Sequence, residues 1–509
     1  MFEEHFEKYI KQCRWFGGKG RTIKEIKVSD KITLPSKDFF QLLIVDIVYS
    51  SEQSEKYLLP VGFDDKMIQQ QGKIAKVIYN EKEGVLYEAT FDEKFRGLLI
   101  DLINQNKKIN LDNGNLIASR GKYFNSFLKD KKLPENSMIS QAQQSNTSFI
   151  YDDVFFLKLY RRLQIGENPE AQLTKYLTEK TNFDKLPFFA GSIQYNKNKD
   201  ETYTIALLQK YITNKGDAWE YFSNGVKRFL NKAAKQSQYA QTEELIEPAI
   251  TQKVRLLAKR TAQLHIALSD FSENGNMKPE PVSKDYRLFL YESTMELANN
   301  IFSELNFDNY GDLIKDDVAR LISVKDAIFA KIQEIKNMNI SGQLIRTHAD
   351  YHLGQILFTG DDFIISDFEG EPTRSFSLRT QKHIALRDIA GIIRSFHYAA
   401  YAPVLKNHSQ NGQTPLFTYW AQQWYQYISE VFLNSYLKDV LQANFLSNVP
   451  EELDYLLDFY MLEKAIYELD YELHNRPSWL MVAAKGVLQI IEKRVEVHHF
   501  VKAKGEKYD

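Results

Sequence analysis

The first part of the chain has the hydrophobic pattern of a sheet. From Ile23 to about Glu88, short runs rich in β-branched and aromatic residues are separated by polar or glycine-containing turns. Runs of this kind predict strands. They are Ile26–Val28, Phe39–Tyr49, Tyr57–Val61 and Ile74–Ile78. We therefore expect a small sheet-rich subdomain over residues 1–90.

The next part, residues 91–212, mixes strands with a helix. Its apolar segment Phe95–Ile103 is followed by a sequence rich in Asn, Lys and Gly, which indicates a junction. Beyond the junction, period-2 runs and a run with charged ends predict four further elements. These are a hairpin of Ser148–Ile150 and Val154–Leu159, a helix over Pro169–Lys180 and a strand at Thr202–Leu208.

Residues 213–509 have a mostly helical pattern. Apolar residues recur every three or four positions through Val254–Leu268 and again through Leu313–Ile335, and each stretch predicts one helix. Strand signals return only at Gly354–Phe358 and Phe363–Ser366, which predict a short hairpin. The pattern as a whole predicts an α+β protein whose first half holds the sheets.

Composition and charge narrow the class of protein. The chain of 509 residues has 65 Lys and Arg against 67 Asp and Glu, and this net charge of −2 argues against sequence-independent binding of nucleic acid. Its one cysteine, Cys13, excludes an intrachain disulfide and a Cys-based zinc cluster. We see no signal peptide and no apolar run of the ~20 residues that span a membrane. We therefore expect a globular protein of the cytoplasm, without membrane contact.

The hairpin in the helical half lies between two segments that predict phosphoryl transfer. Thr347–Gln355 precedes it and Ser366–Pro372 follows it. The first has the spacing of a kinase catalytic loop, His-x-Asp-x4-Asn, with Gln355 at the Asn position. Phosphoryl transfer needs a carboxylate beside the attacking hydroxyl and hard oxygen ligands for Mg²⁺. Asp350 suits the first task, and Gln355 with Asp367 suits the second.

The middle region offers residues for binding a nucleotide. Kinases place a lysine on a strand and an acid on the next helix, and Lys158 and Glu170 match these positions. No Gly-x-Gly-x-x-Gly loop precedes them. Four polar residues stand there instead, and their hydroxyls and backbone N–H groups would hold phosphates. They are Ser145, Asn146, Thr147 and Ser148. This departure from protein kinases favours a small-molecule kinase.

Together these motifs resemble the bacterial maltokinases, which are aminoglycoside-phosphotransferase-like members of the protein-kinase-like superfamily. The resemblance extends over nearly the whole chain, with Ala349 as a small departure where the family has Gly. The matching segments are Arg14–Arg21, Ser145–Ser148, Leu157–Leu163, Gly166–Glu170, His348–Gln355, Asp367–Pro372, Leu386–Phe396, Glu463–Glu468 and Asn475–Pro477. It implies a bilobal kinase fold, with a cap over residues 1–90, an intermediate region and N-lobe over 91–212, and a large helical C-lobe over 213–509.

The resemblance also implies an activity. Maltokinases transfer the γ-phosphate of ATP, with Mg²⁺, to the anomeric hydroxyl of maltose, and the maltose 1-phosphate feeds α-glucan (glycogen) synthesis from trehalose or maltose. A trehalose synthase is then a candidate partner of a monomer or weak homo-oligomer. Two alternatives stay open: a kinase of this fold for glucosamine or an aminoglycoside-like substrate, and a catalytically idle module that binds a glycan or a partner enzyme.

Site residues follow from the same resemblance. Asp350 is implied as the base or hydroxyl-orienting residue, and Lys158 as the phosphate lysine. Gln209 and Tyr211 belong to the expected hinge beside adenine. The expected sugar contacts are His348, Asp350, Glu369, Glu468, Tyr471 and Arg476. The last three lie at the end of one predicted helix, where Pro477 pushes Arg476 out of the α region. Carboxylates accept hydrogen bonds from sugar hydroxyls, arginine donates them, and rings stack on pyranose faces.

Several of these residues have a structural interpretation beside the functional one. His265 lies on an apolar helix face and is expected to be a hydrogen-bonded core residue. Arg387 and Asp388 are expected to form a buried ion pair, with catalytic support as the alternative. Glu468 has Lys464 four residues before it, a spacing that suits an exposed ion pair.

Overall fold

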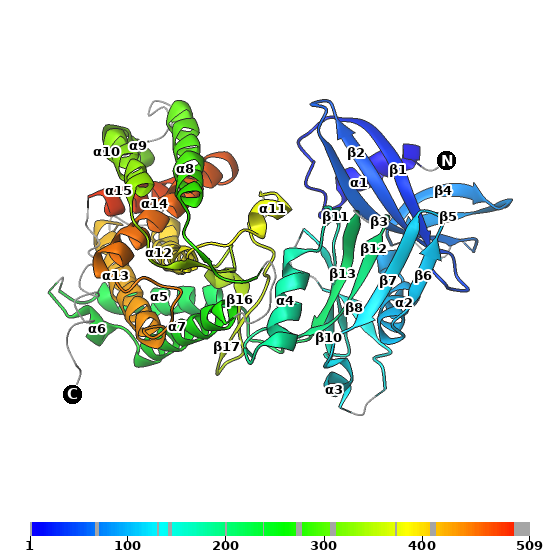
Figure 1. Ribbon diagram of the computed structural model, residues 1–509. Coiled ribbons are helices and arrows are strands. Elements are labelled where there is room, and N and C mark those ends of the chain that lie inside the picture. The colour runs from blue at the N-terminus through cyan, green and yellow to red at the C-terminus, as the bar shows by residue number, and fades with distance from the viewer. Residues whose placement is uncertain are drawn as a thin grey trace. The chain divides into compact units, whose positions relative to one another are not determined.

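The computed structural model divides the chain into two compact units, Met1–Thr213 and Asn214–Asp509. Figure 1 shows that strands dominate the first unit and helices the second. The predicted α+β class is therefore confirmed, whereas the division of the first unit into a cap and an N-lobe stays a prediction. The structure describes residues 3–66, 71–129, 132–140, 145–198, 201–237, 239–270, 277–305, 312–371, 374–407 and 414–492.

The first sheet of the N-terminal unit is antiparallel, with the strand order β1-β2-β3-β5-β4. Four of its strands match the predicted runs, and β5 (Lys82–Glu88) adds a fifth that the pattern did not predict. Asn80 and Glu81 join β4 to β5 with φ angles of 49° and 64°, which suit a tight hairpin turn. The other elements are α1 (Glu3–Gln12), β1 (Ile23–Thr33), β2 (Phe40–Tyr49), β3 (Ser54–Asp64) and β4 (Lys73–Tyr79).

Strand β2 separates two hydrophobic cores, because successive side chains of a strand point to opposite faces. Leu43 and Val45 belong to the core that contains Phe6 of α1. Leu42 and Ile44 belong to the other core, which also contains side chains of α2 (Glu93–Asn104) and of the second sheet. The two sheets of this unit therefore share one hydrophobic interior.

The second sheet has the strand order β6-β7-β12-β13-β10-β9-β8. The predicted hairpin is present, since β9 pairs with β10 and places Ser148 opposite Lys158. The predicted helix is present as α4, where the side chain of Asn168 caps the N–H of Glu170 at 2.8 Å. The bounds are β6 (Lys108–Leu111), β7 (Gly114–Arg120), α3 (Phe124–Leu128), β8 (Ser137–Ile139), β9 (Thr147–Tyr151), β10 (Phe155–Leu159), α4 (Pro169–Lys180), β12 (Phe189–Asn196) and β13 (Thr202–Lys210).

Arg161, which follows β10, connects the two sheets of the N-terminal unit. Its guanidinium is fully buried, forms an ion pair with Glu88 of β5 and lies 4.7 Å from the centre of the Trp15 ring. Its Nε donates to Thr147 Oγ1 at 2.8 Å, and its backbone N–H donates to Asn146 Oδ1 at 3.2 Å. The first sheet thus fixes the position of two residues of the predicted phosphate-binding segment. The short strand β11 (Arg162–Leu163) adds a backbone pairing with β3.

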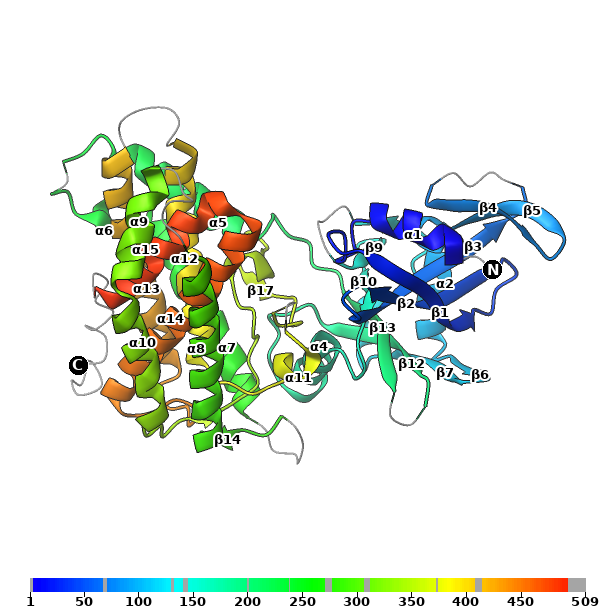
Figure 2. The ribbon, with the colours of Figure 1, turned by 90° about the horizontal axis from the view of Figure 1, so that it is seen from above.

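Long helices build the second unit. Their contacts run in the order α8-α14-α12-α13-α7, and Figure 2 shows these helices as the tall bundle of the unit. The predicted hairpin is present as β16 (Ile356–Phe358) and β17 (Phe363–Ile365). The other bounds are α5 (Ala218–Ala233), α6 (Thr242–Leu245), α7 (Pro248–Ser269), β14 (Glu280–Pro281), α8 (Lys284–Glu304), β15 (Gln343–Leu344), α11 (Phe376–Arg379), α12 (Leu386–Asn407), α13 (Thr414–Asp439), α14 (Pro450–Asn475) and α15 (Leu480–Ile491).

The prediction of a single helix over Leu313–Ile335 is wrong. The segment forms α9 (Asp312–Ser323) and α10 (Lys325–Glu334), with Val324 outside the helical region at φ −100° and ψ 9°. The break lets the two halves face different neighbours, because α9 packs against α15 and α10 against α8. The apolar repeat continues through the break, so periodicity alone does not detect it.

Within the described residues, we find no helix that combines the length and the apolar character needed to cross a membrane.

We predict that Arg161→Ala strongly destabilises the N-terminal unit. The substitution leaves the buried Glu88 carboxylate without its cation, which typically costs about 3–5 kcal/mol. Urea denaturation followed by tryptophan fluorescence measures the loss. The matched control is Arg228→Ala, because Arg228 is half exposed and pairs with Glu247 at 2.8 Å, so its loss should cost less than about 1 kcal/mol. Equal effects of the two substitutions would contradict the prediction.

Candidate active site

The predicted catalytic segment of the second unit is held by one buried aspartate. Asp388, in the first turn of α12, accepts the backbone N–H of His348 at 2.7 Å and that of Ala349 at 3.1 Å. Its Oδ2 also accepts from His265 Nε2 at 3.2 Å, while His265 Nδ1 lies 2.8 Å from the hydroxyl of Tyr436. Burial alone would raise the pKa of Asp388, but the hydrogen bonds from His265 and the backbone keep the pKa below its usual value. The carboxylate is therefore ionised and fixes the chain next to Asp350.

His265 and Arg387 each have a buried partner of their own. His265 is a hydrogen-bonded core histidine, as expected. Arg387 and Asp388 do not form the expected ion pair, because Arg387 binds Glu463 with both Nε and Nη2 at 3.3 Å while Asp388 binds the catalytic segment. Neighbouring residues at the start of a helix point about 100° apart, so each finds its own partner.

Ala349 has a left-handed backbone conformation, with φ of 66°. A residue with a Cβ adopts this conformation at a cost of roughly 1–2 kcal/mol, whereas glycine adopts it freely. Asp388 binds the N–H of this strained residue and that of the residue before it, and these bonds offset the cost. An alanine at this position therefore carries a cost in backbone strain.

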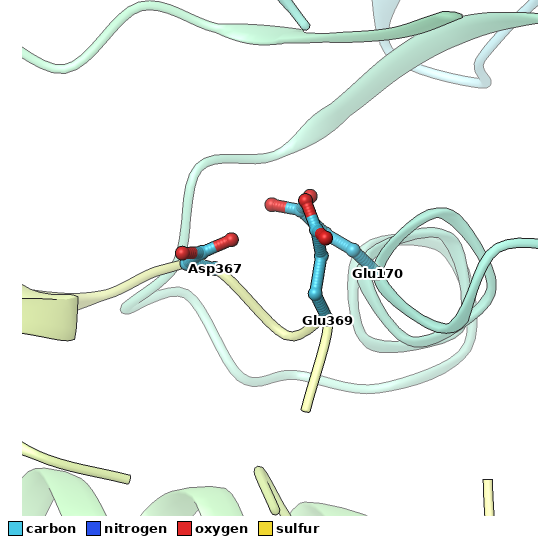
Figure 3. Close-up of side chains that lie close together, drawn as sticks. All are labelled: Glu170, Asp367 and Glu369. Carbon is cyan, nitrogen blue, oxygen red and sulfur yellow. The ribbon is translucent and has the colours of Figure 1, made fainter. Parts of the chain in front are cut away.

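The predicted metal ligands lie at the paired ends of the β16–β17 hairpin. Gln355 directly precedes β16, and its carbonyl accepts the N–H of Ser366, just after β17, at 2.9 Å. Asp367 follows with a left-handed φ of 65°. Figure 3 shows the side chains of Asp367 and Glu369 on the segment after β17. Pro372, at the end of the predicted motif, lies outside the described residues. The hairpin brings these two residues close along the backbone, and a side-chain amide with a carboxylate is a donor set that fits Mg²⁺, which prefers hard oxygen ligands.

His348 is placed differently from the expectation of a sugar contact. Its ring is fully buried between Tyr351 and Phe368, with ring centres 5.2 and 4.8 Å away. Its Nε2 donates to the carbonyl of Ser366 at 2.9 Å. The ring therefore joins the catalytic segment to the segment after β17, and the geometry does not support direct contact with a sugar.

Asp350 lies among groups that favour its ionised form. Lys464 Nζ of α14 lies 3.7 Å from Asp350 Oδ1, and His352 Nε2 lies 3.7 Å from Oδ2. Burial alone would raise the pKa of Asp350, but His352 and the ammonium of Lys464 hold the pKa well below its usual range. Asp350 is therefore an ionised carboxylate at neutral pH.

A cluster of buried charges surrounds this aspartate. Glu371 accepts from Lys464 Nζ at 3.1 Å, and it also pairs with Arg374 and, at 3.6 Å, with Arg387. Glu463, next to Lys464 on α14, binds Arg387 at 3.3 Å. Burial alone would raise the pKa of Glu371, but the adjacent cations lower it. The cluster thus consists of ionised groups that neutralise one another.

Glu468 does not form the ion pair with Lys464 that its spacing suggests. Arg394 of α12 donates its Nε to Glu468 Oε2 at 2.9 Å, and its guanidinium is buried. Lys464, the expected partner four residues before, points instead to Asp350 and Glu371. A sugar contact of Glu468 stays a prediction, and Arg394 orients the carboxylate that would make it.

The end of α14 presents rings and charges on a partly exposed surface. The helix ends at Asn475, and Arg476 leaves the helical region with φ −144° and ψ 67°, as its position before Pro477 predicts. Arg476 donates to Glu472 at 2.6 and 3.0 Å, and its guanidinium lies 5.2 Å from the Tyr471 ring and 5.3 Å from the Trp479 ring. The Trp479 ring stacks on that of Tyr398, with ring centres 5.9 Å apart.

In the N-terminal unit, Lys158 and Glu170 form the pair that kinases use at a nucleotide. Lys158 Nζ donates to Glu170 Oε2 at 2.8 Å, and Tyr160 donates its hydroxyl to the same oxygen at 3.0 Å. Figure 3 shows Glu170 in the first turn of α4. Both charged side chains are buried, and such a pair persists only when its geometry is good.

Three residues of the polar segment, Asn146, Thr147 and Ser148, line a cavity of about 440 Å³ within the same unit. Arg14, Trp15 and Glu88 are among the other residues of its wall. Asn146 and Thr147 accept hydrogen bonds from Arg161, Ser148 is buried on β9, and Ser145 is exposed. Gln209 is buried on β13, and Tyr211 follows this strand with its N–H bound to the Val154 carbonyl at 2.8 Å. Their contact with a nucleotide stays a prediction.

Sequence reasoning missed five residues of the second unit that the structure places at these sites. The sequence suggested Arg387 as the ion-pair partner of Asp388, and an exposed ion pair of Lys464 with Glu468. Arg394 and the aromatic pair Tyr398 and Trp479 had no role assigned. A polar residue inside an apolar helix pattern, as at Asp388 and Arg394, was the available signal, since a charge in such a position needs a buried partner.

We predict that Asp388→Asn destabilises the second unit and lowers activity. The amide leaves one backbone N–H of the catalytic segment unsatisfied, which costs about 1–3 kcal/mol. Because the pKa of Asp388 is lower in the folded state than in the unfolded state, where it is about 3.9, the carboxylate stabilises the fold at pH values above about 3.9. This contribution is lost as the pH falls through the pKa of the folded state. The gap in melting temperature between wild type and variant should therefore narrow below about pH 4. Asp326→Asn, at an exposed first-turn aspartate of α10, is the control and should show no such gap.

Comparisons with known proteins find a matching family and similar proteins. Residues 9–92 match the family described as the maltokinase N-terminal cap domain. The glucosamine kinase of Mycolicibacterium smegmatis is 21% identical over 259 residues, which are 51% of this chain and 58% of that protein. The glucosamine kinase of Streptacidiphilus jiangxiensis is 21% identical over 360 residues, which are 70% of this chain and 73% of that protein. The chain therefore spans less than two thirds of the first relative.

A solved structure of a glucosamine kinase in complex with glucosamine, ADP and inorganic phosphate superposes on most of the chain. The TM-score is 0.65 at 14% sequence identity, over 95% of this chain and 98% of that one. At this identity the likeness establishes the fold. The chain therefore has the fold of glucosamine kinase, and its residues 9–92 match the maltokinase N-terminal cap domain, the family that the sequence motifs resemble.

Proposed function

We propose that this protein is a sugar kinase that transfers the γ-phosphate of ATP to the anomeric hydroxyl of maltose and releases maltose 1-phosphate. The observation that supports phosphoryl transfer is the partly buried and ionised Asp350 in the segment before the β16–β17 hairpin. The match of residues 9–92 to the maltokinase cap domain favours maltose as the acceptor.

In this proposal Asp350 orients the acceptor hydroxyl. Because its pKa is held low, the carboxylate is a weak base, yet it accepts a hydrogen bond well. The loose transition state of phosphoryl transfer asks mainly for alignment and charge stabilisation. A fixed and ionised carboxylate supplies the alignment. As the bond between the γ-phosphorus and the leaving oxygen of ADP breaks, the new O–P bond to the acceptor forms and the hydroxyl proton passes to Asp350.

Gln355 and Asp367 would hold Mg²⁺, and their positions at the hairpin ends suit hard oxygen ligation. When bound, the ion supplies positive charge against the phosphates of the nucleotide. Lys158, oriented by Glu170, would contact the phosphates. The segment Ser145, Asn146, Thr147 and Ser148 would enclose them, and Gln209 and Tyr211 would lie beside the adenine.

The acceptor sugar would bind at the end of α14. Glu468, oriented by Arg394, accepts hydrogen bonds from hydroxyls, and Arg476 donates them. Tyr471 is exposed enough to stack on a pyranose ring. Glu369, after β17, would accept from a further hydroxyl. His348 acts in this scheme by holding the catalytic segment.

Glucosamine is the second candidate acceptor, because both relatives described above are glucosamine kinases. The amine of glucosamine is a cation at neutral pH, so an acidic site would favour it. An idle module that only binds a glycan or a partner enzyme is the third, and the ordered Lys158–Glu170 pair and the low pKa of Asp350 argue against it.

The wider context belongs to the same proposal. Maltose 1-phosphate is an activated donor of maltosyl groups, which suits α-glucan (glycogen) synthesis from trehalose or maltose. A trehalose synthase that supplies the maltose is the expected partner of a monomer or weak homo-oligomer. ATP as the phosphoryl donor suggests the cytoplasm as the place of the reaction.

We predict that the purified chain releases ADP in the presence of ATP, Mg²⁺ and maltose, above the rates with glucose, glucosamine or water. Phosphorus NMR of the product should show an anomeric phosphate. Omission of Mg²⁺ should abolish turnover. A higher rate with glucosamine than with maltose would show that glucosamine is the acceptor. No turnover with any sugar would reject the kinase proposal.

We predict that Asp350→Asn lowers kcat by at least about 10²-fold, because the amide neither carries the charge nor accepts the proton. The melting temperature should change little, since Asp350 has no described backbone partner to lose. Asp361→Asn, in the exposed turn of the same hairpin, is the matched control and should keep normal kcat. An active Asp350→Asn variant would remove Asp350 from its role.

A further inference from the structure

Lys464 occupies a position for which the proposed mechanism has so far no use. It lies in the middle of α14, and its side chain is 20% exposed. Its ammonium lies 3.1 Å from Glu371 Oε1 and 3.7 Å from Asp350 Oδ1. The acid four residues later, Glu468, is the usual partner of a helical lysine, but Arg394 already binds it. The lysine is therefore directed into the cluster around Asp350.

The charges of this cluster balance in a way that leaves Lys464 for Asp350. Glu371 and Glu463 are two carboxylates, and Arg374 and Arg387 are the two guanidinium groups that bind them. This part of the cluster is neutral without the lysine. A largely buried ammonium is costly unless it serves a carboxylate, and the remaining carboxylate within reach is that of Asp350.

The two distances suit a lysine that is anchored at one carboxylate and acts on the other. At 3.1 Å, Lys464 forms a hydrogen bond with Glu371, whose side chain is 3% exposed and held by the arginines. At 3.7 Å, it is too far from Asp350 for a direct hydrogen bond but close enough for strong attraction. The oxygens of Asp350 thus stay available to an acceptor hydroxyl while the charge of the carboxylate is stabilised.

We propose that Lys464 is a positioning residue for Asp350: anchored on Glu371, it keeps the catalytic carboxylate ionised and directed toward the acceptor hydroxyl. The role of Lys464 in directing Asp350 toward an acceptor hydroxyl rests on the proposed function. The state of the carboxylate is a property of the second unit and is measurable without turnover. The charged and titratable groups that face Asp350 include His348, His352, Glu371 and Lys464.

The kinetic test compares Lys464→Met with a matched control. Lys331→Met removes a lysine of α10 with a similar side-chain exposure, 18%. Lys331 binds Asp458 of α14, the helix that carries Lys464, at 2.8 Å. We expect Lys464→Met to lower kcat by about 10- to 100-fold with less than about a threefold change in the KM for the sugar, because alignment acts in the transition state. Lys464→Arg should recover most of kcat. Equal kcat values for Lys464→Met and Lys331→Met would overturn the proposal.

The second test follows Asp350 directly. The full chain is labelled with ¹³C at the aspartate side-chain carboxyl, and the Asp350 signal is assigned by its loss in Asp350→Asn. An opposite charge at this distance lowers a carboxyl pKa by about one to three units, so Lys464→Met should raise the pH at which Asp350 titrates by at least about one unit, and Lys464→Arg should not. An unchanged titration in Lys464→Met overturns the proposal.

The two tests separate this inference from the proposed function. If wild type turns over no sugar, the kinase proposal fails, and the titration alone decides the role of Lys464. If Lys464→Met does not fold, Lys464→Gln, which keeps a hydrogen-bond donor for Glu371, takes its place in both tests. A purely structural lysine would lower the melting temperature without moving the titration of Asp350.

Discussion

The candidate active site depends on the carboxylate of Asp388. It accepts the backbone N–H groups of His348 and Ala349 and is itself oriented by His265, so one side chain links α12 and α7 to the catalytic segment. A carboxylate that accepts several N–H groups can remain ionised in a buried place. The strained φ of Ala349 persists because these bonds hold its own N–H and that of the preceding residue. These bonds also fix the position of Asp350, which directly follows Ala349.

Around that anchor the second unit concentrates buried charge. Each carboxylate of the cluster has a cation, and the pKa directions of Asp350 and Glu371 follow from these pairs. Buried ion pairs are seldom a source of stability, because the cost of desolvation is comparable with their attraction. Their presence at one place therefore indicates a functional demand, here a carboxylate that stays ionised where water is partly excluded.

In the first unit, a buried ion pair connects the two sheets. The alternation of β2 gives the first sheet two hydrophobic faces, one of which it shares with the second sheet. Arg161 crosses this shared interior from Glu88 to Thr147 and Asn146. The region that matches the maltokinase N-terminal cap domain is thus connected by a buried charge to the segment predicted to hold phosphate. A cap and a phosphate-binding segment joined in this way would move together.

The sequence by itself determined the α+β class, most of the strands, the β16–β17 hairpin and the motifs around Asp350 and Lys158, because these depend on local periodicity and spacing. It did not determine the break at Val324, since both halves of the apolar repeat remain in phase. Nor did it reveal the partners of Asp388, Lys464 and Glu468, because a charge pairs with whatever the packing brings near it. Only the tertiary structure decided that His348 is buried and that Lys464 serves Asp350 rather than Glu468, because helices distant in the sequence supply the competing partners.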